Sequence, residues 1–186
     1  VDVNSSSLSL LPQEWSWDFE SGTFGPEWTL GGSANWNIQT INVLSGSQTA
    51  KAGTISDGQE TSLTLDVSAL PAGSGTFQYE VSSESGWDYL VFCIDNTGCS
   101  RSSGFNQQWS GITSGTHSFT ITSNTQTLTW KYAKDFSALA GSDTAWIDDI
   151  TITPTGGAGN GVGSWTSPAF GPSLSGQGEP RSYGFM

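Results

Sequence analysis

Apolar and polar residues alternate in short stretches along most of the chain, with a period of two. Because successive side chains of a β-strand point to opposite faces, this pattern predicts strands with one buried face. Clusters of Gly, Ser, Pro and Asp separate the stretches and predict tight turns. The predicted strands centre on Trp15/Trp17/Phe19, Trp36/Ile38, Leu63/Leu65/Val67, Phe77/Tyr79/Val81, Leu90/Phe92/Ile94, Phe119/Ile121, Leu128/Trp130/Tyr132 and Trp146 to Ile152. No stretch has a helical period, so the sequence predicts an all-β protein.

The size of the chain fits one domain. It has 186 residues, of which 34% are hydrophobic and 12% charged, enough for one sizeable core. Turn clusters such as Gly31–Ser33, Ser45–Ser47, Ser56–Gly58 and Pro71–Gly75 recur at the spacing of a sandwich. We expect a two-sheet antiparallel jelly-roll β-sandwich over residues 14–153.

Segments of different composition flank the predicted sandwich. Residues 1–13 form a Ser-rich N-terminal arm, and residues 154–186 form a Gly-, Ser- and Pro-rich C-terminal tail. Apolar residues in these segments are candidates for docking on neighbouring copies: Leu8, Leu10, Leu11, Trp165, Phe170, Tyr183 and Phe185. A start at Val1 predicts a processed mature form.

The charge balance excludes some partners. Seventeen Asp and Glu residues against five Lys and Arg give a net charge of −12, which repels a phosphate backbone and argues against nucleic acid. No apolar run approaches the roughly 20 residues needed to cross a bilayer, so we expect no membrane span.

The two cysteines lie six positions apart. Asp95 to Gly98 reads as a turn that places Cys93 and Cys99 on facing strands of a hairpin, within reach of a disulfide. The alternative is a pair of reduced, buried thiols. A disulfide predicts an oxidising compartment, outside the cell or at its surface.

Catalytic arrangements are hard to build from this sequence. His117 is the only histidine, so no Ser-His-Asp, Cys-His or two-His metal site is available. His117 reads as a strand residue, and we expect no enzyme activity.

Acidic residues near both ends of the predicted sandwich point to a structural calcium ion. Asp18 and Glu20 close the first strand, and Asp148 and Asp149 lie in the last; these terminal strands run side by side in a jelly roll. Calcium binds six to eight oxygen ligands. We expect Glu20 and Asp149 to bind through carboxylates, with Asp148 nearby and carbonyls from Asp18 and Lys51. The alternative is that Asp148 and Asp149 are ordinary polar residues on the outer face of a strand and that Glu20 makes a cap or a salt bridge.

Tryptophans offer flat faces on which sugar rings stack. Trp28, Trp87 and Trp109 lie near predicted turns and are the surface candidates. Those on alternating strand positions, Trp17, Trp36, Trp130 and Trp146, read as core residues. The alternative for the first three is also a place in the core.

Several motifs resemble those of a known family in order and spacing. They are Trp17–Gly22, Trp28, the Ser45–Gly46 turn, Phe77–Ser82 and Ala145–Ile150. Together they resemble a bacterial MAM-like jelly-roll domain, and are similar to calcium-stabilised carbohydrate-binding modules of families four and twenty-two. The resemblance covers Trp15 to Thr153 and implies a two-sheet sandwich, a structural metal near the paired ends, and binding or adhesive roles in secreted proteins. The additional cysteines of MAM modules are missing, so receptor-type homophilic adhesion is not implied.

Two functions follow from these observations. The first is an extracellular, calcium-stabilised structural subunit that assembles into a filament, sheath or surface layer through its arms. The alternative is a secreted carbohydrate-binding or cell-adhesion module whose partner is a glycan or surface ligand.

Overall fold

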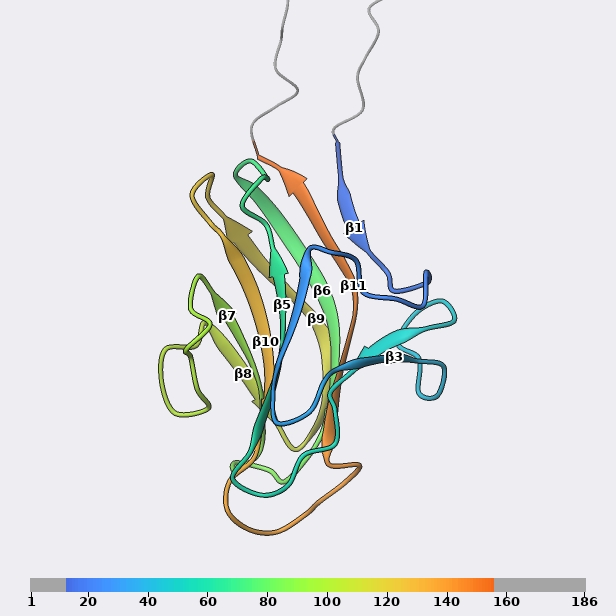
Figure 1. Ribbon diagram of the computed structural model, residues 1–186, viewed down its shortest axis with the longest axis vertical. Helices are drawn as coiled ribbons and strands as arrows, with labels where there is room; N and C mark the ends of the chain where they lie inside the picture. Colours follow the sequence, from blue (N-terminus) through green and yellow to red (C-terminus); the bar gives the residue numbers. More distant parts are fainter. Residues whose placement is uncertain (1–12, 156–186) are drawn as a thin grey trace, which may run out of the picture.

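The computed structural model describes residues 13–155, which form eleven strands and no helix (Figure 1). Every strand pairing is antiparallel. The strands are β1 (Trp15–Trp17), β2 (Trp28–Gly32), β3 (Asn37–Gln39), β4 (Thr49–Lys51), β5 (Glu60–Asp66), β6 (Gly73–Ser82), β7 (Tyr89–Ile94), β8 (Gln107–Ser110), β9 (Ile112–Ile121), β10 (Thr127–Ala133) and β11 (Thr144–Pro154). These residues contain no helix of the length and hydropathy needed to span a membrane.

The strands form two sheets. The six-stranded sheet has the order β3-β4-β11-β6-β9, with β1 also paired to β11, and the five-stranded sheet has the order β2-β5-β10-β7-β8. The predicted all-β jelly-roll sandwich is confirmed. The proposed assembly contacts in the arms, Leu8, Leu10, Leu11, Trp165, Phe170, Tyr183 and Phe185, lie outside the described residues.

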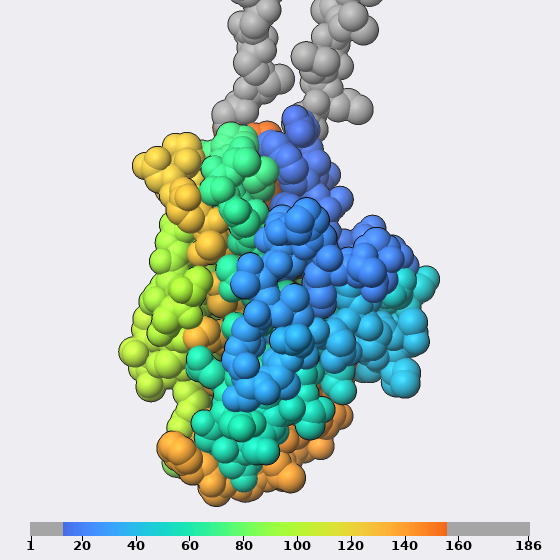
Figure 2. All heavy atoms as spheres, in the orientation of Figure 1, coloured from blue at the N-terminus to red at the C-terminus, as the bar shows by residue number. Residues whose placement is uncertain are grey.

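The two ends of the sandwich differ. At one end β1 lies along the last part of β11, with Trp15 opposite Ile152. At the other end the connections 83–88 and 134–143 follow β6 and β10 (Figure 1). Residues 134–143 (orange) cover this end, opposite the first residues of β1 (dark blue) in Figure 2.

The core lies between the sheets and is rich in aromatic rings. Phe77 of the six-stranded sheet packs on Phe92 and Trp130 of the five-stranded sheet, with ring centroids 4.9 Å and 5.2 Å apart. All three side chains are completely buried. Burying each such side chain contributes about 1.5–3 kcal/mol. The inward-facing apolar residues that produce the alternation in the sequence therefore stabilise the fold.

Strand β2 was not predicted, because its Gly31 and Gly32 read as a turn. Gly32 has φ +88°, and a side chain there would collide with the backbone of Glu60 and Thr61. A glycine is therefore required at the last position of this strand, which is still paired with β5. The strand places Trp28 inside the core.

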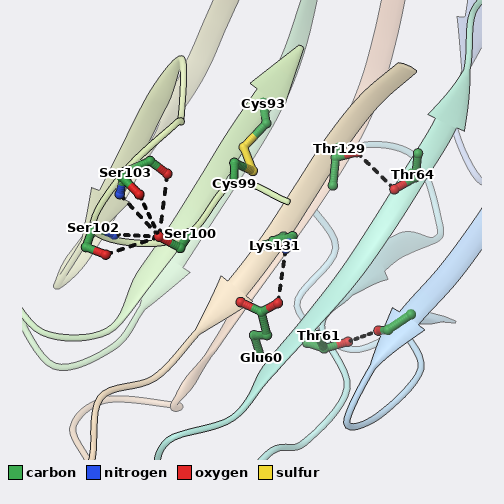
Figure 3. A network of polar contacts seen from close by, with 11 residues as sticks. Glu60, Thr61, Thr64, Cys93, Cys99, Ser100, Ser102, Ser103, Thr129 and Lys131 are labelled. Carbon is green, nitrogen blue, oxygen red and sulfur yellow. Dashed lines mark hydrogen bonds and ion pairs between the residues drawn. A yellow bond between two sulfur atoms is a disulfide. The ribbon is translucent and has the colours of Figure 1, made fainter. Parts of the chain in front are cut away.

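Cys93 and Cys99 form the predicted disulfide, with Cα atoms 6.5 Å apart. The predicted hairpin is wrong in one detail, because Cys99 lies in the connection 95–106 and β8 begins only at Gln107. The connection folds over the outer face of the five-stranded sheet, where both cysteines are buried against Val91 and Phe105. Figure 3 shows this face, with the disulfide beside the Thr64–Thr129 hydroxyl pair.

Candidate functional site

The outer face of the six-stranded sheet is lined by hydroxyl and amide groups. Alternation along β6 turns Phe77 and Val81 into the core and Ser74, Thr76, Gln78 and Glu80 outward. The outward residues of the neighbouring strands are similar. They include Ser114, Thr116, Ser118 and Thr120 of β9 and Thr151 and Thr153 of β11.

Three adjoining hollows follow β6 along this face. The first, of 510 Å³, is lined chiefly by hydroxyl side chains of β6, β9 and β11, including Thr76 and Thr151. The second, of 330 Å³, is lined by Gln78 and Glu80. The third, of 500 Å³, shares Glu80 and adds the amides of Asn37, Gln39 and Asn42. The face therefore carries a continuous strip of hydrogen-bonding groups.

Cross-strand contacts hold these groups in place. The hydroxyls of Thr76 and Thr151 lie 3.0 Å apart. Gln78 Nε2 donates to Asp149 Oδ2 at 2.8 Å, and Asn42 Nδ2 donates to Glu80 Oε1 at 3.1 Å. Groups that are already positioned lose less entropy when a ligand binds.

Trp146 also lies on this face, at the third hollow. The Nζ atom of Lys51 lies 6.0 Å from its ring centroid, within range of a cation–π contact. Trp146 is only 4% exposed, in agreement with the expectation that it is buried. Its covered ring offers no open face for a sugar.

The predicted sugar-stacking tryptophans do not form one site. Trp28 was expected near the surface but is 8% exposed, since its ring packs on Phe19 and Trp130 with centroids 5.5 Å and 6.1 Å away. Trp109 is half-buried and stacks on Tyr79 at 4.1 Å. Trp87 is 55% exposed, in the connection 83–88 at the end opposite β1.

Two of the predicted calcium ligands, Glu20 and Asp148, bind the same loop. Glu20 Oε1 accepts bonds from the backbone N–H groups of Ser47 and Gln48 at 2.7 Å and 3.0 Å, which lower the pKa of Glu20. The buried Asp148 Oδ2 accepts from Ser45 N at 3.2 Å, and burial raises the pKa of Asp148 to about 6. Both carboxylates therefore fix the loop that leads into β4.

The other three predicted ligands, Asp149, Asp18 and Lys51, each contact a different residue. Asp149 has φ +44° at an irregularity in β11 and binds Gln78. Asp18 Oδ1 accepts from the backbone N–H of Glu20 at 3.1 Å. Lys51 lies on β4, opposite Trp146. Calcium binding by Glu20, Asp149, Asp148, Asp18 and Lys51 stays a prediction.

A separate acidic cluster was missed by sequence reasoning. Glu84, Asp88 and Asp135 each place an oxygen within 4.8 Å of the others, the one group of three metal-ligand side chains found in residues 13–155. Glu84 and Asp88 are four residues apart in one turn, which is visible in the sequence. Asp135 follows β10 far along the chain, and only the fold brings it to the turn.

His117 lies on β9, as expected, and faces aromatic rings. Its ring centroid is 5.2 Å from that of Trp109, 5.4 Å from Phe77 and 5.6 Å from Phe92. Burial lowers the pKa of the imidazole. These contacts make His117 part of the packing between the sheets.

Comparison with known proteins bears on the fold. No family model and no curated protein matches the chain. Among solved structures, the K1 cleaved adhesin domain of Lys-gingipain from Porphyromonas gingivalis W83 gives a TM-score of 0.54 at 13% identity, covering 77% of this chain and 99% of that chain. A carbohydrate-binding module of the β-sandwich superfamily gives 0.50 at 17% identity, covering 72% and 59%. A xylan-binding domain of carbohydrate-binding family 22 gives 0.49 at 13% identity, covering 76% and 94%.

At these identities the first two matches show a shared fold only. The chain has the β-sandwich fold of an adhesin domain and of a carbohydrate-binding module. The resemblance to carbohydrate-binding modules is thus confirmed for the architecture. Membership of a MAM-like family or of family four stays a prediction.

Proposed function

We propose that this protein is a non-catalytic extracellular binding or adhesion module that recognises a glycan on the outer face of its six-stranded sheet. The observation that carries the proposal is the strip of hydroxyl and amide groups along β6, with its three adjoining hollows. Such groups both donate and accept hydrogen bonds, as sugar hydroxyls do. The succession of three hollows along the face favours an extended ligand.

Two further observations support this function over self-assembly. An adhesin domain and a carbohydrate-binding module share the fold, and the disulfide agrees with a protein that works outside the cell. The self-assembly hypothesis depends on residues of the arms, which lie outside the described residues.

The test is a matched pair of Thr-to-Val variants. Thr76 pairs with Thr151 on the proposed binding face, and Thr64 pairs with Thr129 on the outer face of the five-stranded sheet (Figure 3). Each substitution keeps the shape and removes one hydroxyl. The wild-type chain is first screened against a panel of immobilised plant, fungal and bacterial polysaccharides. Affinity for the best ligand is then measured by calorimetry.

We expect Thr76→Val to weaken glycan binding about fivefold, since one hydrogen bond contributes about 1 kcal/mol. Thr64→Val, on the other face, is expected to bind as the wild type does. Equal affinities of the two variants would place the binding site elsewhere. Failure of the wild type to bind any polysaccharide of the panel would overturn the glycan function.

A further inference from the structure

The acidic cluster at the end opposite β1 consists of Glu84, Asp88 and Asp135. The backbone N–H of Asp88 donates to the Glu84 carbonyl at 3.1 Å and closes a turn that brings these two side chains together. The backbone N–H of Asp135 donates to Asp88 Oδ1 at 2.8 Å and brings in the third carboxylate. The cluster thus joins the connection after β6 to the connection after β10.

Two carboxylate oxygens of the cluster have no partner. Asp88 is completely buried and Asp135 is 8% exposed. Asp88 Oδ2 and Glu84 Oε2 are both buried, and neither accepts a hydrogen bond from residues 13–155. A buried carboxylate oxygen without a donor is costly, and neighbouring like charges increase the cost. The arrangement therefore calls for a positive charge.

The basic side chains near the cluster are engaged elsewhere. Lys134 precedes Asp135, but its Nζ pairs with Asp57 Oδ1 at 2.9 Å and Asp143 Oδ2 at 2.6 Å. Arg101 Nη1 donates to the carbonyl of Trp87. Neither forms an ion pair with the three carboxylates, so the two unpartnered oxygens have no basic side chain bound to them within residues 13–155.

We propose that Glu84, Asp88 and Asp135 bind a hard divalent cation, foremost calcium, at the end of the sandwich opposite the paired terminal strands. All the side-chain ligands are oxygens, which suits calcium or magnesium better than zinc or copper. Three carboxylates have up to six oxygens to offer, and calcium accepts the irregular geometry of two loops more readily than magnesium does. This site is distinct from the one predicted at Glu20 and Asp149 and does not depend on glycan binding.

A cation at this position would fasten two loops that carry exposed apolar side chains. Trp87 lies between Glu84 and Asp88 and is 55% exposed, while Phe136 and Leu139 follow Asp135 and are 83% and 70% exposed. These three residues are cleavage sites for chymotrypsin. Calcium should therefore slow cleavage at this end of the molecule.

The experiment uses the full chain and two variants of the cluster, Asp88→Asn and Glu84→Gln. Asp66→Asn is the matched control, since Asp66 is exposed and lies at the opposite end of the sheet, where it binds Ser68. Calcium binding is measured by calorimetry up to about 10 mM, because extracellular modules bind calcium in the millimolar range or tighter. Thermal unfolding and chymotrypsin cleavage are followed with calcium and with EDTA.

We expect each cluster variant to weaken calcium binding at this site at least about tenfold, because one charged ligand is lost. In EDTA, Asp88→Asn should unfold at the same temperature as the wild type or higher, since it removes a buried charge. In calcium it should unfold at a lower temperature than the wild type. The Asp66→Asn control should follow the wild type under both conditions.

The glutamate at the other predicted site provides a second control. Glu20→Gln should leave calcium binding at the cluster unchanged. The proposal is wrong if Asp88→Asn and Glu84→Gln bind calcium as the wild type does, if Glu20→Gln alone abolishes binding, or if the wild type binds no calcium at these concentrations. A variant that only damages the fold would unfold at a lower temperature than the wild type both in EDTA and in calcium. Asp88→Asn is expected to do so in calcium alone, which identifies the effect as lost cation binding.

Discussion

His117 links the packing between the sheets to pH. Burial among aromatic rings lowers the pKa of its imidazole below the ordinary value of 6.5. Below about pH 6.5 the unfolded chain therefore binds a proton more readily than the folded protein does, and folding loses stability. We expect the free energy of unfolding to fall more steeply between about pH 7.5 and about pH 5 in the wild type than in His117→Gln, as measured by urea unfolding.

Asp148 has the opposite effect on the pH dependence of stability, so the wild type has to be compared with His117→Gln. Burial raises the pKa of Asp148 to about 6, so the folded protein binds that proton more readily and stability rises as the pH falls through this value. Both proteins carry Asp148, and its effect cancels in their difference. The same pH dependence in wild type and His117→Gln would contradict the role given to His117.

At the residue scale, the sequence correctly predicted most side chains that face the core, but it did not predict which polar residues from distant parts of the chain come together. Alternation correctly identified Trp36 and Trp130 as core residues. It failed for Trp28, because the adjacent Gly31 and Gly32 hid the strand. The cluster of Glu84, Asp88 and Asp135 could not be predicted, since Asp135 joins the other two only through the pairing of strands.

The connection 95–106 is the element that the disulfide restrains. Closing a loop this short stabilises a fold by about 2 kcal/mol in the loop-entropy description. We therefore expect Cys93→Ala combined with Cys99→Ala to lower the free energy of unfolding by about that amount in urea. Val91 and Phe105, which pack on the cysteines, should become more exposed.

The reduced wild type provides the control for that variant. Reduction breaks the same bond without removing the sulfur atoms, so it should lower stability by a similar amount. If neither reduction nor the double substitution changes the unfolding midpoint, the disulfide does not restrain this connection. A loss seen only in the double variant would assign the effect to packing around the sulfurs.

At the scale of elements, a strand was predictable where apolar residues alternate along it, as in the short β1 and β3, whereas only the end of the long β9 was recognised. The strands β5, β6, β7, β10 and β11 each carry several alternating apolar residues, which form one face of a sheet. The three-residue β4 and four-residue β8 show no such alternation. They are recognisable only from the strands beside them, β11 and β7.

The polar features of the molecule belong to different elements of the fold. The loop held by Glu20 and Asp148 leads into β4, the hydroxyl and amide strip follows β6, and the acidic cluster lies beyond the ends of β6 and β10. The sequence predicted a sandwich but not the order of strands in each sheet. Because that order places β6 between β9 and β11, the proposed binding face could not be derived from sequence alone.

Residues 13–155 contain a buried core and both sheets, so we expect this segment to fold without the rest of the chain. Its free energy of unfolding and urea dependence should match those of the full chain, because the same apolar surface is buried. Light scattering then gives the mass of the particles that the segment and the full chain form.

If the protein is a binding module, both should be monomers. Polymers formed by the full chain alone would instead favour assembly through the arms, whereas an unfolded segment would show that residues outside 13–155 complete the core.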